Sequence, residues 1–255
     1  MNTWSNGCRQ SSNTTFVAFG AGSSRYHNAS RRLFSQAQDT GVFNEAYAYN
    51  GEELKADPIF WRKNGHFISS NNRGWGYWLW KPYIIMRHLH SMKEGGVLLY
   101  ADAGCEINPN STNIMREMID IARDSKKIVG SKTCIEREWT KMDLLLLLDA
   151  NKPEYLNTRQ NAATTNMFIK TPAIMNLVES WYEIGCDYHM IDDSPSVASN
   201  LPCFKEHRHD QSIFSLLTKT RDLINEDVDI RNKGAVISYR NKTGKSKITG
   251  KTYKW

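Results

Sequence analysis

Hydrophobic and polar residues alternate along this chain in two kinds of block. Short continuous apolar runs, bounded by glycine or polar residues, predict strands buried on both faces. Longer segments, in which apolar residues recur every three or four positions, predict amphipathic helices. The predicted strands are 15–19, 46–49, 97–100, 127–130 and 162–169, and the predicted helices are 30–39, 83–92, 113–123, 172–185 and a last helix that opens at residue 210.

The first three predicted elements follow the order strand, helix, strand. That order favours a parallel sheet with helices on its faces, so the expected fold class is α/β. The central strand is 97–100, which ends abruptly at Asp102, Ala103 and Gly104. In open α/β sheets ligands bind at the carboxyl ends of strands, where a carboxylate can accept hydrogen bonds from a ribose or bind a divalent cation. Asp102 is therefore a candidate site residue, although Asp and Gly are also common in ordinary turns.

Other segments interrupt the pattern. The aromatic and basic segment 60–67 and the long segment 187–201 are both expected to be irregular, and Thr140 is expected to cap a helix that carries the leucines 144–148. The stretch 71–82 reads NNRGWGYWLWKP, in which two glycines among large aromatics suggest a loop of defined shape. Of its tryptophans 75, 78 and 80, at least two are expected in the core, while one could stack on a sugar or a base.

The composition sets limits on this picture. The chain has 255 residues, of which 40% are hydrophobic and 24% charged, and its formal charge is +6. These values suit one domain, 1–255, with a sizeable core and an acidic ligand such as a nucleotide diphosphate. Basic residues gather from about residue 225, where we expect a solvated C-terminal extension, and 1–15 are expected to form a loose arm. Five scattered cysteines, no apolar signal segment and no membrane span favour a reducing, cytoplasmic location.

Several candidate residues stand in a known order. Lys81 begins a helix before the central strand, Asp102 ends that strand, Asn166 lies in a later strand, and Asp210 with Gln211 opens a late helix. This order resembles that of nucleotide-sugar glycosyltransferases with the GT-A fold, such as glycogenin and the bacterial lipopolysaccharide galactosyltransferases. The runs GYWLWKP, DAGC and HRHDQS also resemble glycan-synthesis transferases of bacteria and large viruses. The resemblance covers most of the chain and implies a Rossmann-like α/β fold with a mostly parallel central sheet flanked by helices.

The resemblance places Asp102 at the ribose or at a metal ion of the donor. The family carries Asp-x-Asp at this point, whereas this chain has Gly104 where the second aspartate, the usual ligand of Mn²⁺ or Mg²⁺, is expected. Two possibilities stay open: transfer without a metal, or a metal site that Asp102 completes with His207 or His209. Both histidines could equally be ordinary surface residues.

The other roles follow from the chemistry that the resemblance implies. Transfer from a nucleotide diphosphate sugar builds negative charge on the leaving phosphate, which cations such as Lys81 and Arg73 would stabilise. The donor-binding candidates are Lys81, Asp102, Gly104, Arg73 and Asn166.

The catalytic candidates are Asp210 and Gln211. The resemblance favours retention of the anomeric configuration, with Gln211 supporting a cation-like transition state. In an inverting enzyme Asp210 would act as the base toward the acceptor hydroxyl. Asp210 could also be no more than the N-cap of its helix.

The predicted function is transfer of a hexose or pentose from a nucleotide diphosphate sugar, UDP-linked by preference, to a glycan or glycoprotein acceptor. No nucleic-acid partner is expected. One alternative is a sugar nucleotidyltransferase, which would carry a Gly-rich basic loop near the amino terminus, and 20–25 is only a faint version of such a loop. The other alternative is a glycan- or nucleic-acid-binding module that has lost catalysis.

Overall fold

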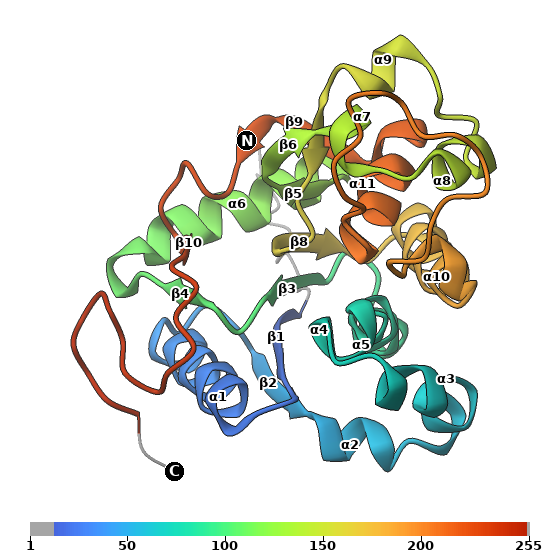
Figure 1. Cartoon of the computed structure of the whole chain (residues 1–255). Helices are drawn as coiled ribbons and strands as arrows, with labels where there is room; N and C mark the ends of the chain where they lie inside the picture. The colour runs from blue at the N-terminus through green and yellow to red at the C-terminus, as the bar shows by residue number, and fades with distance from the viewer. Residues whose placement is uncertain (1–12, 254–255) are drawn as a thin grey trace, which may run out of the picture.

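A six-stranded sheet forms the centre of the structure, a computed structural model that describes residues 13–253 (Figure 1). The strand order is β2-β1-β3-β8-β5-β9. Two short ribbons, β4 with β10 and β6 with β7, lie outside this sheet. The strands are β1 (Thr14–Gly20), β2 (Glu45–Asn50), β3 (Val97–Ala101), β4 (Cys105–Ile107), β5 (Ile128–Gly130), β6 (Lys132–Ile135), β7 (Arg159–Asn161), β8 (Thr165–Ile169), β9 (Ile224–Asp229) and β10 (Val236–Ser238).

Helices cover both faces of the sheet. Figure 1 shows α1 and α6 on one side and α3, α5, α10 and α11 on the other. The helices are α1 (Ser24–Asp39), α2 (Gly51–Lys55), α3 (Pro58–Ser70), α4 (Gly74–Tyr77), α5 (Trp80–Ser91), η1 (Pro109–Ser111), α6 (Thr112–Ser125), α7 (Glu136–Trp139), α8 (Met142–Leu147), α9 (Pro153–Leu156), α10 (Pro172–Gly185), η2 (Tyr188–Met190) and α11 (Asp210–Thr220). Within residues 13–253, none of these helices has the length and apolar character needed to cross a membrane.

The direction of the strands confirms the expected α/β class with a mostly parallel sheet. β1 runs parallel to β2 and β3, and β5 runs parallel to β9. β8 alone is reversed, since it is antiparallel to both of its neighbours, β3 and β5. The reversal pairs Ala101, the last residue of β3, with Thr165, the first residue of β8. The carboxyl end of the central strand therefore lies beside the loop that enters β8.

The segment 60–67 is helical, so the expectation of an irregular segment is wrong. Asp57 caps α3, because its Oδ1 accepts hydrogen bonds from the backbone N–H groups of Ile59 and Phe60, and Pro58 occupies the first turn. The buried positions of α3 fall on one face at helical spacing: Phe60, Asn64, Gly65, Phe67 and Ile68. Because this segment is rich in aromatic and basic residues, the helical spacing of its buried positions is not evident from the sequence.

The expected cap of α8 is also wrong. Lys141, not Thr140, occupies the N-cap of that helix, and it makes no side-chain cap hydrogen bond. The hydroxyl of Thr140 instead donates to Glu136 Oε1 at 2.6 Å, inside a buried polar cluster. Local sequence favours threonine at caps, but a buried carboxylate offers a stronger acceptor.

The basic C-terminal segment packs against the body, which corrects the expectation of a solvated extension. β9 is the edge strand of the central sheet, and β10 pairs with β4. The carboxylate of Glu106, a fully buried residue of β4, accepts hydrogen bonds from Asn241 Nδ2 at 2.6 Å, Ser246 Oγ at 2.6 Å and the backbone N–H of Lys247 at 2.9 Å. Most of the loose arm expected at 1–15 lies outside the described residues.

Candidate active site

The ammonium group of Lys81 lies between two carboxylates. Its Nζ is 2.8 Å from Asp210 Oδ2 and 3.3 Å from Asp102 Oδ1. Lys81 comes from the first turn of α5, Asp102 directly follows β3, and Asp210 begins α11, so three distant segments meet at the carboxyl end of the central strand. The side chains of Lys81 and Asp210 are 3% and 5% exposed, whereas that of Asp102 is 30% exposed. Asp102 is therefore the member of this trio that a ligand can reach.

One cation shared by two carboxylates sets the electrostatics of the trio. Burial pulls the pKa of Lys81 down, but the charges of Asp102 and Asp210 outweigh burial and leave that pKa above its usual value. Burial raises the pKa of Asp210 to about 6, and the attraction of Lys81 only partly offsets this effect. Asp210 thus titrates close to neutrality, which is the range where a carboxylate serves as an acid or base.

Tyr100 is a site residue that the sequence did not reveal. It lies in the apolar run of β3, but its hydroxyl donates to Asp102 Oδ1 at 2.7 Å, and its ring lies 5.5 Å from Lys81 Nζ. Burial, followed by the charge of Asp102, raises the pKa of Tyr100 well above its usual value. The hydroxyl therefore stays protonated and holds the Asp102 carboxylate in one orientation.

Asp210 is not the N-cap of its helix. His209 occupies that position with φ 54° and ψ −127°, a conformation that residues with a side chain rarely adopt. The backbone carbonyl of Asp210 accepts a hydrogen bond of 2.8 Å from Trp181 Nε1. The strained turn and this bond orient the Asp210 side chain toward Lys81.

Both histidines near the site are buried and uncharged. His207 uses both ring nitrogens: Nδ1 accepts from the backbone N–H of Lys141 at 3.3 Å, and Nε2 donates to the carbonyl of Met190 at 3.0 Å. His209 Nδ1 bonds to the carbonyl of Ile191 at 2.9 Å. Burial lowers the pKa of His207 well below its usual range and that of His209 to about 4. The bonds to Met190 and Ile191 therefore hold the segment 187–209 together, and the bond from Lys141 joins this segment to the start of α8.

The side chains of the other predicted site residues form no ion pair or hydrogen bond with the trio within residues 13–253. Arg73 forms ion pairs with Asp193, at 3.1 Å, and with Glu206. Asn166 is fully buried, with its Nδ2 donating to the carbonyl of Ala162 at 2.9 Å and no hydrogen bond to its Oδ1 within the described residues. Gln211 follows Asp210 but donates from its Nε2 to Gln160 Oε1 at 2.8 Å.

The aromatic stretch forms a left-handed turn. All five residues from Gly74 to Trp78 have positive φ, between 52° and 85°. A side chain at position 74 would meet Trp78 at 2.4 Å, and one at position 76 would meet Ile68 at 2.6 Å, so both glycines are required. The turn is strained at its three aromatic residues, and such strain concentrates at functional sites.

The two partly buried tryptophans of the left-handed turn contact different parts of the structure. The indole of Trp75 lies at the carboxyl ends of β1 and β2, because a Cβ built on Gly22 or Gly51 would lie 3.7 Å or 3.0 Å from it. Trp78 stacks on His209, with ring centroids 5.6 Å apart. Trp80 alone of the three tryptophans is buried, at 5% exposure, so the expectation that two are core is wrong.

The residues around Asp102 do not fit a divalent cation. In the part of the chain that the structure describes, no group of three or more His, Cys, Asp or Glu residues is placed to hold a metal. Gly104 supplies no side chain, and a Cβ there would lie 3.2 Å from the Cα of Arg240. The C-terminal segment therefore fills the space beside Gly104. Metal dependence itself stays a prediction.

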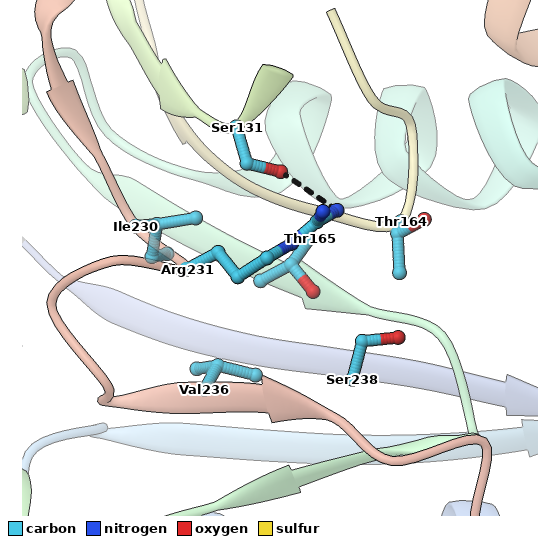
Figure 2. Close-up of a pocket in the computed structure, with 7 residues that line it drawn as sticks. All are labelled: Ser131, Thr164, Thr165, Ile230, Arg231, Val236 and Ser238. Carbon is cyan, nitrogen blue, oxygen red and sulfur yellow. Dashed lines mark hydrogen bonds between the residues drawn. The ribbon is translucent and has the colours of Figure 1, made fainter. Parts of the chain in front are cut away.

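A small pocket opens beside Asp102 (Figure 2). Its empty space, part of which is open solvent, is about 210 Å³, and it is lined by Ser131, Thr164, Thr165, Ile230, Arg231, Val236 and Ser238. The backbone N–H of Asp102 donates to the carbonyl of Thr164 at 2.9 Å, so the pocket adjoins the trio. Figure 2 shows the Arg231 side chain lying along the pocket, with its guanidinium beside Ser131.

Arg231 gives this pocket a positive charge. Its guanidinium donates to Ser131 Oγ at 3.5 Å, and no carboxylate of residues 13–253 forms an ion pair with it. A cation beside several hydroxyl groups suits an anionic ligand. The sequence showed Arg231 only as one of many basic residues near the C-terminus.

The sequence matches no protein-family model and no curated protein. Among solved structures, the chain is similar to mouse xyloside xylosyltransferase 1 in its apo form, with 10% identity over 83% of this chain and 84% of that chain, and a TM-score of 0.41. It is also similar to the apo structure of the bifunctional glycosyltransferase WbbM, with 9% identity over 93% of this chain and a TM-score of 0.39. The chain spans 48% of the WbbM chain. At these TM-scores neither likeness carries an argument about function.

Proposed function

We propose that this chain is a glycosyltransferase of the GT-A class that moves a sugar from a UDP-linked donor to a hydroxyl group of a glycan acceptor. The observation that carries the proposal is the buried Lys81 ammonium, which holds Asp102 and Asp210 together at the carboxyl end of the central strand. Ligands of open α/β sheets bind at this edge. The trio joins one reachable carboxylate to one whose pKa is about 6.

The base and ribose of the donor would lie across the ends of β1, β2 and β3. Trp75 offers a partly exposed indole beside Gly22 and Gly51, and a nucleobase can stack on such a ring. Asp102 would accept hydrogen bonds from the ribose hydroxyls. Its Oδ1 already accepts from Tyr100, so its other oxygen is the one left for the donor.

The diphosphate would lie near the pocket of Figure 2. Lys81 is fully buried against two carboxylates, so it is poorly placed to meet a diphosphate directly. Arg231 has no carboxylate partner within the described residues and lines the pocket together with Thr164, which belongs to the loop that enters β8. A guanidinium there would stabilise the negative charge that develops on the leaving phosphate.

Asp210 and Gln211 would act next to the anomeric carbon. Asp210 is largely ionised at neutral pH, because its pKa is about 6. Its side chain is only 5% exposed, so it would act on a cation-like transition state through its charge rather than by direct contact with the acceptor. Gln211 adds an uncharged acceptor in the same turn of α11. Retention of the anomeric configuration is proposed on the order of the motifs alone, and proton NMR of the product anomer would decide it.

A thermal-shift screen tests the proposal directly. UDP-, GDP-, CMP- and dTDP-sugars are each added with a chelator and, separately, with manganese, since a ligand raises the melting temperature only if it prefers the folded state. We expect a saturable shift with UDP and UDP-sugars that Asp102→Ala weakens. Asp222→Asn is the control, because Asp222 is exposed, pairs with Lys127 in the described part of the chain, and has a positive φ of 51° that asparagine tolerates. Binding of single-stranded oligonucleotides without any nucleotide sugar would contradict the proposal.

A further inference from the structure

A buried hydrogen-bond chain leads from the core to Gln211. Gln160 is a fully buried residue of β7, and its Oε1 accepts a hydrogen bond of 2.8 Å from Gln211 Nε2. The Nε2 of Gln160 lies 2.9 Å from Glu136 Oε1, 2.9 Å from Thr140 Oγ1 and 3.1 Å from Ser212 Oγ. The chain thus joins α7, β7 and α11.

Every neighbour of the Gln160 nitrogen is an acceptor. Glu136 is fully buried, and its Oε2 pairs with Lys219 Nζ at 2.6 Å, so its carboxylate can only accept. The hydroxyl of Thr140 gives its proton to Glu136, and the hydroxyl of Ser212 gives its proton to the carbonyl of Trp139. Gln160 must therefore turn its nitrogen toward this cluster.

The direction of Gln160 decides the direction of Gln211. With its nitrogen toward Glu136, Gln160 turns its carbonyl oxygen toward Gln211, and only the nitrogen of Gln211 can donate to that oxygen. The oxygen of Gln211 then points away from Gln160. Gln211 is half-buried, and no residue of 13–253 donates a hydrogen bond to that oxygen.

We infer that Gln160 is a positioning residue, held by Glu136, that orients the Gln211 amide so that its oxygen is presented to the substrate. The inference rests on the proposed function. An oxygen facing the anomeric carbon stabilises positive charge there, whereas an amide turned the other way would present N–H groups and oppose it. The buried ion pair of Glu136 with Lys219 thus acts on transfer without touching the substrate.

The kinetic test removes the Gln160 amide while keeping its volume. We expect Gln160→Met to lower kcat by roughly tenfold or more, the scale on which a misplaced catalytic group acts, with an unchanged dissociation constant for UDP. Ser215→Ala is the matched control. It removes a hydrogen bond of 2.6 Å to Glu136 and the acceptor of the Asn161 backbone N–H at 2.9 Å, so it disturbs β7 beside Gln160. It leaves the partners of the Gln160 amide in place, so kcat should stay near wild type. Equal losses of kcat in both variants would overturn the inference.

A double-mutant cycle separates positioning from general damage. If Gln160 acts through Gln211, then adding Gln160→Met to Gln211→Met should change kcat by less than about twofold, because the two residues act as one unit. Fully additive losses would mean that Gln160→Met disturbs the site in some other way, which contradicts the inference.

An NMR measurement keeps the inference separable from the proposed function. The Gln211 side-chain amide protons are assigned by their loss in Gln211→Met, and their exchange with water is then measured. We expect slow exchange in the wild type and fast exchange in Gln160→Met, whether or not the chain transfers a sugar. Fast exchange in the wild type would overturn the inference. If the Gln211 amide protons exchange slowly in the wild type but no sugar is transferred from any donor, the proposed function is contradicted and the inference is not.

Discussion

The Nζ atom of Lys81 lies 2.8 Å from Asp210 Oδ2, and both side chains are almost completely buried. The same ammonium also serves Asp102, so the trio carries one positive charge against two negative charges when both carboxylates are ionised. Burial raises the pKa of the Asp210 carboxyl group, and the ammonium that it shares with Asp102 offsets this rise only in part.

Asp210→Asn should lower transfer by about a hundredfold or more, the scale of a lost base or electrostatic group. The substitution should not destabilise the fold at pH 7, because asparagine resembles the protonated carboxyl that the burial of Asp210 favours. Turnover and melting temperature are measured on the same samples. Asp222→Asn, at an exposed position, is the control. Normal turnover in Asp210→Asn would make Asp210 a structural residue.

Stability should depend on pH through Asp210. Its pKa in the folded state is about 6, above the unfolded value of about 3.9, so the folded state holds the extra proton between these values. The stabilising contribution is therefore complete below about pH 4 and is lost as pH rises through about 6. Urea unfolding of the wild type and of Asp210→Asn, compared from pH 4 to 7, isolates this effect. A constant difference across that range would contradict the raised pKa.

Activity should follow the same group in the opposite direction. If the ionised Asp210 takes part in transfer, kcat/KM should rise with pH and level off above an apparent pKa of about 6. The low-pH limb should be missing from the residual activity of Asp210→Asn. A limb that persists in the variant would belong to another group.

Lys81→Met should be strongly destabilising at neutral pH. Among residues 13–253, Lys81 is the only cation within 4 Å of the buried Asp210 carboxylate, so the change leaves two carboxylates without their shared cation. Breaking a buried ion pair in this way costs about 3–5 kcal/mol. Acidification should rescue part of the loss, since a protonated Asp210 needs no cation. Urea unfolding at pH 5 and pH 7 measures the rescue, and an equal loss at both values would refute this account.

Exhaustive chelation should leave transfer intact. Asp102 is the only carboxylate of the expected motif, Gly104 faces the backbone of Arg240, and both nitrogens of His207 are occupied. Transfer is measured with a chelator and again after manganese is added back. Complete loss that manganese restores would contradict transfer without a metal, and metal binding by His209→Ala would then test whether that histidine is a ligand.

Glu106→Ala should loosen the C-terminal segment. Hydrogen bonds from Ser246, Asn241 and Lys247 outweigh burial and hold the pKa of Glu106 below its usual value. Removing the carboxylate leaves these buried donors without an acceptor, a loss of about 1–3 kcal/mol. Hydrogen exchange of 236–248 should speed up, whereas Glu94→Ala, at an exposed position, should change nothing. Unchanged exchange in Glu106→Ala would mean that other contacts hold the segment.

The sequence by itself determined the elements whose signals are local. The apolar run 97–100, the helix 172–185 and the start of α11 at residue 210 depend on neighbouring residues, and each lies where the pattern predicted it. The order of the motifs also predicts Asp102, Lys81 and Asp210 as site residues, without any information on the contacts between them.

Only the tertiary structure decided how these residues are used. Whether a cation is free depends on which distant carboxylates fold against it, so Lys81 and Arg73 are paired, while Arg231 faces an open pocket. The same holds for the segment after 225, whose basic pattern suggests solvent exposure but which a buried Glu106 holds against the body. The sequence shows which side chains can carry a charge. The partner of each side chain, its burial and hence its pKa depend on segments that are far apart in the sequence.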